Sequence, residues 1–253
     1  MTALLLDVGN SRIKWGLRDD GSIRRTGHIS RQRIREDGLQ ILSRKLPKRV
    51  SEILVSNVAG PSFATRLSGF LGMHCECDVH FARAQKAGWG VRNSYSQPRR
   101  MGVDRWVAMV GAWAEFQSAC LVVDAGTALT LDAIDENGMH LGGQIIPGSR
   151  TMASALSSAT SDIPVVRPLS AGSEACMQMF GTSTSAAVRE GAQNAIVGAI
   201  DRASRTLQES GFKATTVLTG GDASRILGSL ATPPIHRPHL VLQGLAHMLD
   251  SAQ

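Results

Sequence analysis

LLLDVGNSRIKWGLRDDG, residues 4–21, matches LVVDAGTALTLDAIDENG, residues 121–138, in its general pattern when the two stretches are aligned at an offset of 117 residues. In each stretch an apolar triplet is followed by an aspartate, by a glycine two positions later and by a small polar residue. Alternating apolar and polar residues then continue to a second turn that ends in glycine. The pattern predicts that each stretch forms a β-hairpin and that the chain contains a duplication.

The bend inside each copy has the composition of a phosphate-binding turn. Glycine lets the backbone approach a ligand and present its N–H groups, Asp7 or Asp124 adds a metal-facing carboxylate, and Asn10 or Thr127 adds a neutral donor. Two such turns facing each other across a cleft could hold the two ends of a triphosphate. The alternative is a pair of ordinary turns in which each aspartate bonds its own backbone.

Other nucleotide-binding motifs are absent from the sequence. It contains no G-x-x-x-x-G-K-[ST], and no G-x-G-x-x-G follows an apolar strand. A third glycine turn, Thr219-Gly-Gly-Asp222, lies between an apolar strand and a stretch with helical spacing. These glycines could admit an adenosine against the backbone, or they could form a plain strand-to-helix turn with Asp222 near the N-cap.

The remaining pattern predicts an α/β protein in two halves, residues 1–118 and 119–253, which pack directly and leave a cleft. An irregular stretch is expected around Pro164 and Pro168. The predicted helices cover Arg31–Leu46, a segment after Pro61, Val103–Phe116, a segment opened by Pro147-Gly148, and Thr184–Ser210. The predicted strands cover Glu52–Val58, Met73–Phe81 and Met139–Ile145.

Composition favours a folded, cytoplasmic chain without a membrane segment. Of its 253 residues 43% are hydrophobic and 19% are charged, which suits a chain that buries a core. No apolar run approaches the roughly 18 residues that span a bilayer, and no basic segment precedes the short apolar stretch at the start. The four cysteines form no CxxC and are too few for a disulfide framework, so we expect a reducing compartment.

The net charge of +6 suits an anionic ligand. Basic residues are densest in Arg24–Arg49, where acidic residues and regularly spaced apolar residues favour a solvated helix over a nucleic-acid surface. Aromatic residues make up only 4% of the chain, which leaves little for a platform that stacks single-stranded bases. Nucleic acid is therefore not the expected partner.

The cysteines and histidines of His74–His80 resemble a metal cluster. Read as a strand, the segment places Cys75 and Cys77 on one face and its two histidines on the other. We therefore expect a strand with buried cysteines rather than a zinc site.

Gly102-Val-Asp-Arg105 lies at the predicted start of the Val103–Phe116 helix. An acidic residue in the first turn of a helix is favoured by the helix dipole alone. An adjacent aspartate and arginine beside a cleft could also place a base near an alcohol and a guanidinium near a carboxylate. The pair would suit an acidic, hydroxylated substrate.

With these motifs in order, the chain resembles the type III pantothenate kinases of the actin and sugar-kinase superfamily. Ser11 stands where this family usually has threonine, and Ser183 where asparagine is common, so Thr182 competes with Thr184 for the matching role. The matching segments are Asp7–Lys14, Gly102–Arg105, Asp124–Thr127, Gly142–Gly148, Gly181–Thr184 and Thr219–Asp222. They span nearly the whole chain.

The resemblance implies a duplicated ribonuclease H-like, actin-like ATPase fold with mixed sheets flanked by helices. It implies phosphorylation of pantothenate by ATP, the first step of coenzyme A biosynthesis, with Asp104 as general base. It puts a monovalent cation, K⁺ or NH₄⁺, on Asp124. It implies a homodimer whose substrate pocket is completed by the partner subunit. The implied ATP-binding residues are Asp7, Val8, Gly9, Asn10, Ser11, Arg12, Ile13, Lys14 and Thr127. The implied pantothenate-binding residues are Tyr95, Gly102, Val103, Asp104, Arg105 and Thr184.

Phosphoryl transfer depends mainly on alignment and charge neutralisation, so Asp104 needs position more than basicity. Mg²⁺ is expected to arrive with ATP and to use few protein carboxylates, Asp7 being the candidate. Two alternatives remain. One is a related kinase or phosphatase with another small acceptor, and the other is a non-enzymatic regulator that keeps the fold and binds DNA. Arg105 with Tyr95 favours an acid as acceptor, and the three carboxylates at positions 7, 104 and 124 favour an enzyme.

Overall fold

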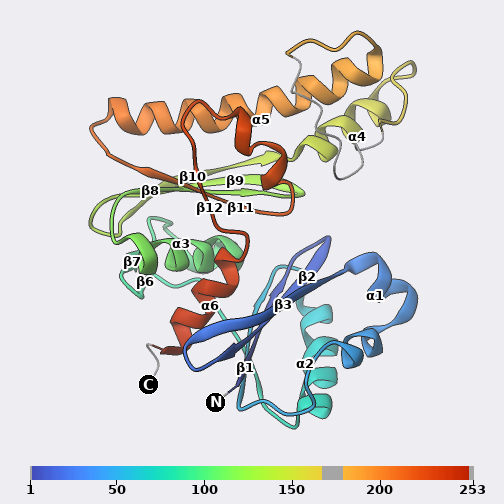
Figure 1. Cartoon of the computed structure of the whole chain (residues 1–253), viewed down its shortest axis with the longest axis vertical. Coiled ribbons are helices and arrows are strands. Elements are labelled where there is room, and N and C mark those ends of the chain that lie inside the picture. Colours follow the sequence, from blue (N-terminus) through green and yellow to red (C-terminus); the bar gives the residue numbers. More distant parts are fainter. Residues whose placement is uncertain (1, 167–178, 251–253) are drawn as a thin grey trace. The chain divides into compact units, whose positions relative to one another are not determined.

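The computed structural model describes residues 2–166 and 179–250, and it contains two five-stranded sheets with the same strand order (Figure 1). The first sheet has the order β3-β2-β1-β4-β5, built from β1 (Ala3–Val8), β2 (Arg12–Asp19), β3 (Ser22–Ser30), β4 (Glu52–Asn57) and β5 (Val79–Phe81). The second has the order β10-β9-β8-β11-β12, built from β8 (Cys120–Ala125), β9 (Ala128–Ile134), β10 (His140–Pro147), β11 (Thr215–Thr219) and β12 (Ile235–His236). In both sheets the hairpin pair is antiparallel and the later strands are parallel. The predicted duplication is confirmed.

The two sheets belong to two compact units. Unit 1 comprises Met1–Gln117, Asn137–His140 and His239–Gln253, and unit 2 comprises Ser118–Glu136 and Leu141–Pro238. The change of unit after Gln117 lies next to the predicted boundary of 118/119. The structure differs from the prediction at the end of the chain, because α6 (Leu240–Asp250) packs on the first sheet and not with residues 119–238.

Helices cover both faces of the first sheet. The apolar residues of β1 alternate, so Leu4, Leu6 and Val8 pack against α1 (Arg31–Asp37) and α2 (Pro61–Cys75) in one buried cluster. On the opposite face lie α3 (Val103–Phe116) and α6. These two helices cross closely, because a β-carbon added to Gly111 would lie 2.7 Å from the Leu240 carbonyl oxygen. The first sheet is therefore the middle layer of unit 1.

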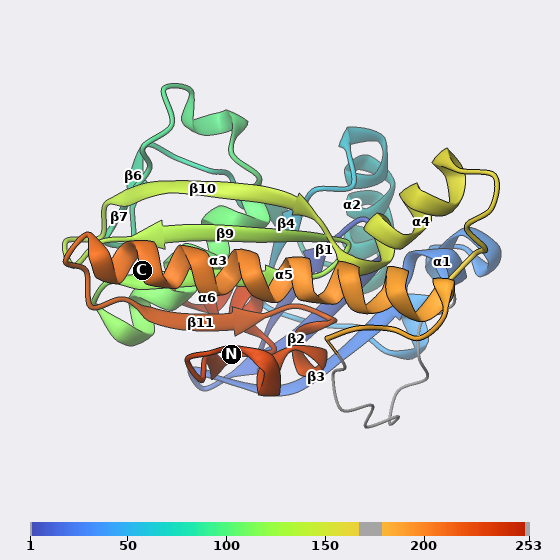
Figure 2. The ribbon, with the colours of Figure 1, turned by 90° about the horizontal axis from the view of Figure 1, so that it is seen from above.

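In unit 2 the long helix α5 (Thr184–Glu209) runs along the second sheet, as Figure 2 shows. Its apolar face, with Ile196, Val197 and Ile200, packs against Leu121 and Leu129 of the sheet. The shorter α4 (Ser149–Ala159) precedes it and contacts it. Two single-turn 3-10 helices, Ala223–Arg225 and Leu227–Ser229, take the place of the helix suggested after the third glycine turn.

The two hairpins differ by one residue in the turn. Four residues separate Val8 from its partner Ile13, whereas three separate Ala125 from its partner Leu129. The burial patterns of β2 and β9 agree along their first six residues only when this deletion is allowed. The ungapped match in the sequence was therefore wrong beyond the turn, and Lys14 corresponds in the structure to Thr130.

Two of the predicted elements are wrong in extent. The helix expected over Arg31–Leu46 breaks at Gly38, whose φ of 76° lies in the left-handed region, and continues as a 3-10 helix over Leu39–Arg44. The strand expected over Met73–Phe81 is also wrong, because α2 extends through Cys75 and β5 begins only at Val79. The predictions for Val103–Phe116 and for the long helix from Thr184 are confirmed.

Within the described ranges, none of the helices has both the length and the hydropathy that crossing a bilayer requires. Pro168, part of the expected irregular stretch, and Cys176 lie outside the described residues.

Candidate active site

The first turn, residues 7–14, connects the two central strands of unit 1. Asp7 is paired with Lys14 across the hairpin, so both side chains project from the same face of the sheet. Asn10 and Ser11 are exposed at the tip, and the Gly9 N–H donates to the Arg12 carbonyl at 3.0 Å. Val8 and Ile13 have fully buried side chains, so only their backbone groups are available to a nucleotide.

The face from which Asp7 and Lys14 project is the face that carries α3. Gly16 lies on the Lys14 side of β2, and a β-carbon there would lie 3.3 Å from Leu242 Cδ1 of α6. Helix α6 in turn packs against α3, whose first turn contains Asp104. In unit 1, Lys14, Asp7 and the first turn of α3 with Asp104 therefore lie on the same side of the sheet.

Asp104 lies in the first turn of α3, where the helix dipole stabilises a carboxylate. Its Oδ1 accepts a hydrogen bond from the Arg105 N–H at 2.8 Å, and the side chain is partly exposed. The carboxylate folds back over Gly102, because a β-carbon on that residue would lie 2.7 Å from Asp104 Oδ1. Glycine at position 102 therefore leaves room for this orientation of the carboxylate.

Arg105 is a buried cation at the same helix start. Its side chain is 6% exposed, and Nη1 donates to the Tyr95 hydroxyl at 3.0 Å. A guanidinium has five donors in a planar fork, a geometry that matches a carboxylate. The structure brings together Tyr95 and Arg105, which the sequence assigned to the same substrate.

Two buried polar residues that the sequence analysis missed hold Tyr95 in place. Asn93 is 1% exposed, and its Oδ1 accepts from the Tyr95 N–H at 3.0 Å. His140 is equally buried, shares a 3.0 Å hydrogen bond with Ser94 Oγ and lies with its ring centroid 6.0 Å from that of Tyr95. Asn93 lies in a short polar stretch, between Arg92 and Ser94, which was a weak sequence signal, and His140 had none.

The second turn, residues 124–130, contains no lysine or arginine side chain. Thr130 stands opposite Asp124 in the hairpin, and Thr219 of β11 is the neighbour of Asp124 on the other side. All three project from the face of the sheet opposite α5, because Leu121, Val123 and Leu218 pack on the α5 side. Thr219 is 1% exposed, and its hydroxyl has no hydrogen-bond partner among the described residues.

Helix α4 begins directly beside the second turn. The Gly148 N–H donates to the Thr127 carbonyl at 2.9 Å, and Thr151 Oγ1 donates to the same oxygen at 2.7 Å. A β-carbon on Gly148 would overlap the carbonyl oxygens of Gly126 and Thr127. The partial positive charge at the start of α4 therefore lies next to Thr127, an arrangement that favours an anion.

The third glycine turn packs against the second turn. Gly220 has a φ of 105°, and a β-carbon there would overlap backbone atoms of Ala125. The Asp222 carboxylate makes no helix-cap bond; it accepts two hydrogen bonds from Arg150 Nη2, at 2.9 and 2.8 Å. Asp222 therefore stands at the N-cap position of the 3-10 helix Ala223–Arg225, as one of the two interpretations expected, but its side chain bonds Arg150 instead of capping the helix. This pair joins the turn to α4.

Thr184 is the first residue of α5 and is exposed. Ser183 is its N-cap, since its side chain accepts from the Ala186 N–H at 3.2 Å. Thr182 is also exposed, so both threonines remain candidates for the substrate contact.

The segment His74–His80 ends a helix and is not the expected strand. Cys75 closes α2 and is buried, whereas Cys77 lies in the following turn. Burial raises the pKa of Cys75 to about 11, with a smaller contribution from Cys77, so the thiol is a poor metal ligand at neutral pH. Over residues 2–166 and 179–250 no group of three His, Cys, Asp or Glu side chains could hold a metal ion.

Comparison with known proteins agrees with this arrangement. A sequence model described as type III pantothenate kinase matches residues 3–206. The chain is 37% identical to the type III pantothenate kinase of Nitrosococcus oceani, over 97% of this chain and 92% of the relative. It is 34% identical to that of Alcanivorax borkumensis, over 99% of both chains.

The chain belongs to the type III pantothenate kinase family. Proteins of solved structure that are more distant in sequence show a similar fold and nothing more. The activator of the 2-hydroxyisocaproyl-CoA dehydratase from Clostridium difficile, solved with bound ADPNP, aligns over 100% of this chain and 96% of its own, at 15% identity and a TM-score of 0.52. A Campylobacter jejuni protein provisionally named as a conserved Baf family transcriptional activator aligns over 98% of both chains, at 19% identity and a TM-score of 0.59. The predicted actin-like ATPase fold, α/β with two mixed sheets flanked by helices, is confirmed.

Proposed function

We propose that this chain transfers the γ-phosphoryl group of ATP to the terminal hydroxyl of pantothenate, giving 4′-phosphopantothenate, the first step of coenzyme A biosynthesis. Its membership of the type III pantothenate kinase family carries the reaction class. The observation that carries the acceptor assignment is that Asp104 stands at the start of α3 next to the buried Arg105, whose side chain bonds Tyr95.

In this proposal the two turns hold the two ends of the ATP phosphates. Lys14 and the exposed tip at Asn10 and Ser11 bind phosphate oxygens in unit 1, and the backbone of residues 8–13 supplies further donors. Thr127 and the start of α4 bind in unit 2. The transition state is loose, so these fixed charges and dipoles act by aligning the reactants and neutralising negative charge.

Asp104 orients the acceptor hydroxyl and takes its proton late in the transfer, as the general base. Its carboxylate is held by the Arg105 N–H and by the glycine at position 102, which gives it one orientation. The Arg105 guanidinium, buried and directed by Tyr95, binds the pantothenate carboxylate. Thr184 completes the acceptor pocket.

The oxygen donors near the turns fit the two expected cations. Mg²⁺, which would neutralise charge on the β- and γ-phosphates, needs only one or two protein carboxylates, and Asp7 at the end of β1 is our candidate. For K⁺ or NH₄⁺ we propose the Asp124 carboxylate. Its support is the adjacent buried Thr219 hydroxyl, which has no partner among the described residues, and Thr130 across the hairpin.

The proposal includes a homodimer in which the partner subunit completes the acceptor pocket. Seven large apolar side chains are exposed among the described residues, and six of them lie within 141–180, just before Thr184. These six are Leu141, Ile145, Leu156, Val165, Met179 and Phe180. Exposed apolar residues concentrated in one part of the sequence, next to a predicted substrate contact, support a protein interface there. Cys75, Cys77 and Cys120 form no disulfide within the described residues, which supports a reducing, cytoplasmic setting.

The test is ADP release with a panel of hydroxy acids and sugars, with and without K⁺, for the wild type and for Asp104→Asn. We expect turnover with pantothenate, dependence on K⁺, and a loss of at least about a hundredfold in kcat for the variant, the scale of a positioned acid or base. Turnover of a sugar instead would overturn the acceptor assignment. Full activity of Asp104→Asn would overturn the base assignment.

A further inference from the structure

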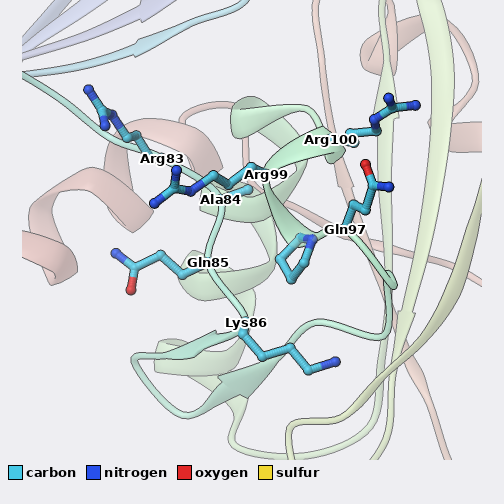
Figure 3. A pocket seen from close by; sticks show the side chains of 8 residues that line it. Arg83, Ala84, Gln85, Lys86, Gln97, Arg99 and Arg100 are labelled. Carbon is cyan, nitrogen blue, oxygen red and sulfur yellow. The ribbon is translucent and has the colours of Figure 1, made fainter.

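A basic pocket of about 610 Å³ lies in unit 1, outside the residues assigned to ATP or pantothenate. Its walls are the segment 83–86 after β5 and the segment 97–100 before α3. Four of the eight residues that line it are cationic and none is acidic; the four are Arg83, Lys86, Arg99 and Arg100. Figure 3 shows Arg83 and Arg99 extending toward one side of the pocket in that view, with Arg100 and Gln97 on the other side.

The side chains of the three arginines in this pocket have no polar partners among the described residues. Within residues 2–166 and 179–250, the side chains of Arg83, Arg99 and Arg100 make no hydrogen bond or ion pair, and all three residues are exposed. Surface arginines of this chain elsewhere do have acidic partners, such as Arg33 with Asp37 and Arg150 with Asp222. A concave surface with charges of one sign raises the local concentration of anions. These guanidinium groups are therefore available to bind an anion.

The pocket is also preorganised. Buried Asn93 joins its two walls: the Asn93 N–H donates to the Lys86 carbonyl at 2.9 Å, Lys86 Nζ donates to the Asn93 carbonyl at 3.1 Å, and Asn93 Nδ2 donates to the Pro98 carbonyl at 3.5 Å. Buried Ala84 forms part of the lining. Because these contacts already fix the backbone, a ligand would order only arginine side chains on binding.

We propose that this pocket binds a small molecule carrying a phosphate or pyrophosphate group. Guanidinium groups pair with phosphate oxygens through two parallel hydrogen bonds, and three arginines with one lysine offset more charge than a single carboxylate brings. The volume is that of a small-molecule site, and Gln85 and Gln97 supply neutral donors beside the charges. The site is separate from the acceptor residues but linked to them, since Asn93 also binds the Tyr95 N–H.

The test measures binding of inorganic phosphate and of pyrophosphate by calorimetry, in EDTA and with the nucleotide site saturated by a non-hydrolysable ATP analogue. The pocket variant carries Arg83→Gln and Arg99→Gln. Both side chains are exposed and make no hydrogen bonds, so the substitutions remove no contact that stabilises the fold. The matched control is Arg24→Gln with Arg44→Gln, which removes the same charge from exposed positions on other elements of unit 1.

We expect one pyrophosphate per chain, bound more tightly than phosphate, with affinity that falls as salt is added. The pocket variant should lose about tenfold or more in pyrophosphate affinity, and the control less than about twofold, because the paired guanidinium contacts rather than the net charge hold the ligand. Equal losses in the two variants, or no binding to the wild type, would overturn the proposal. So would a DNA duplex that binds more tightly than pyrophosphate at the same salt and loses affinity only in the pocket variant.

Discussion

The first and second turns occupy the same place in the two sheets but differ in chemistry. The first has four residues between its paired strand ends and a lysine opposite its aspartate. The second has three residues there and a threonine opposite its aspartate. In place of a cation, the second turn has the start of α4 next to its carbonyl groups and the third glycine turn packed against Ala125.

Under the proposed function, this difference gives the two turns different roles toward the nucleotide. The first turn offers side-chain charge from Lys14 on the face that also carries Asp104, so it suits the phosphate that is transferred. The second turn offers backbone dipoles and hydroxyl groups around Asp124, which suits a phosphate that stays bound together with a cation. The two units are therefore expected to respond differently when a glycine beside each candidate site, Gly148 or Gly102, is changed.

The largest effect is expected from Gly148→Ala, which tests the support of the second turn. The new methyl group would overlap the backbone oxygens of Gly126 and Thr127, which cannot move without shifting β9 or α4. Overpacking of this kind costs about 1–3 kcal/mol, so we expect the free energy of unfolding to fall by ~2 kcal/mol. Urea denaturation followed by circular dichroism measures this change.

Gly191→Ala is the matched control, because a β-carbon at this exposed position of α5 meets no atom within 4 Å. It should leave stability unchanged or raise it by up to about 1 kcal/mol, since alanine is the better helix former. If Gly148→Ala were as stable as this control, α4 would not be packed against the second turn as described.

A smaller effect is expected from Gly102→Ala, which tests the first unit. Here the methyl group would meet a side-chain atom, Asp104 Oδ1, which can rotate away. Stability should therefore change by less than about 1 kcal/mol, while kcat falls roughly tenfold because the base is displaced. Steady-state kinetics and urea denaturation of the same preparation separate the two quantities.

Gly69→Ala in α2 serves as its control, because nothing lies within 4 Å of the added carbon. Its kcat should equal that of the wild type. A Gly102→Ala variant with unchanged kcat would contradict the account in which the carboxylate must fold back over residue 102.

The sequence predicted the parts of the fold that have periodic patterns. Apolar triplets before each aspartate gave the central strands, and spaced apolar residues gave α3 and α5. It could not show that the second turn is one residue shorter. From the sequence alone either Thr130 or Leu131 could correspond to Lys14, and only the burial of the strand residues decides between them. It also mistook the end of α2 for a strand, because Cys75 and Cys77 alternate as they would in a sheet while tertiary packing extends the helix.

Only those residues of the candidate site that belong to a short sequence motif could be predicted. Asp104 and Arg105 belong to a short motif, and the hydrogen bond from Arg105 to Tyr95 is observed. Asn93 and His140 were missed because their importance comes from buried hydrogen bonds between residues distant in the sequence. The C-terminal helix α6 was assigned to the wrong half for the same reason, since only packing shows that it covers the first sheet.

The central claim is that both turns hold one nucleotide, and a double-mutant cycle tests it most directly. The measurement is the Kd of a non-hydrolysable ATP analogue for the wild type, Lys14→Met, Thr127→Val and the double variant. We predict a loss of about tenfold or more for Lys14→Met, a loss of roughly threefold for Thr127→Val, and a double variant near the product of the two. An unchanged Kd for Thr127→Val, with normal stability, would contradict the account.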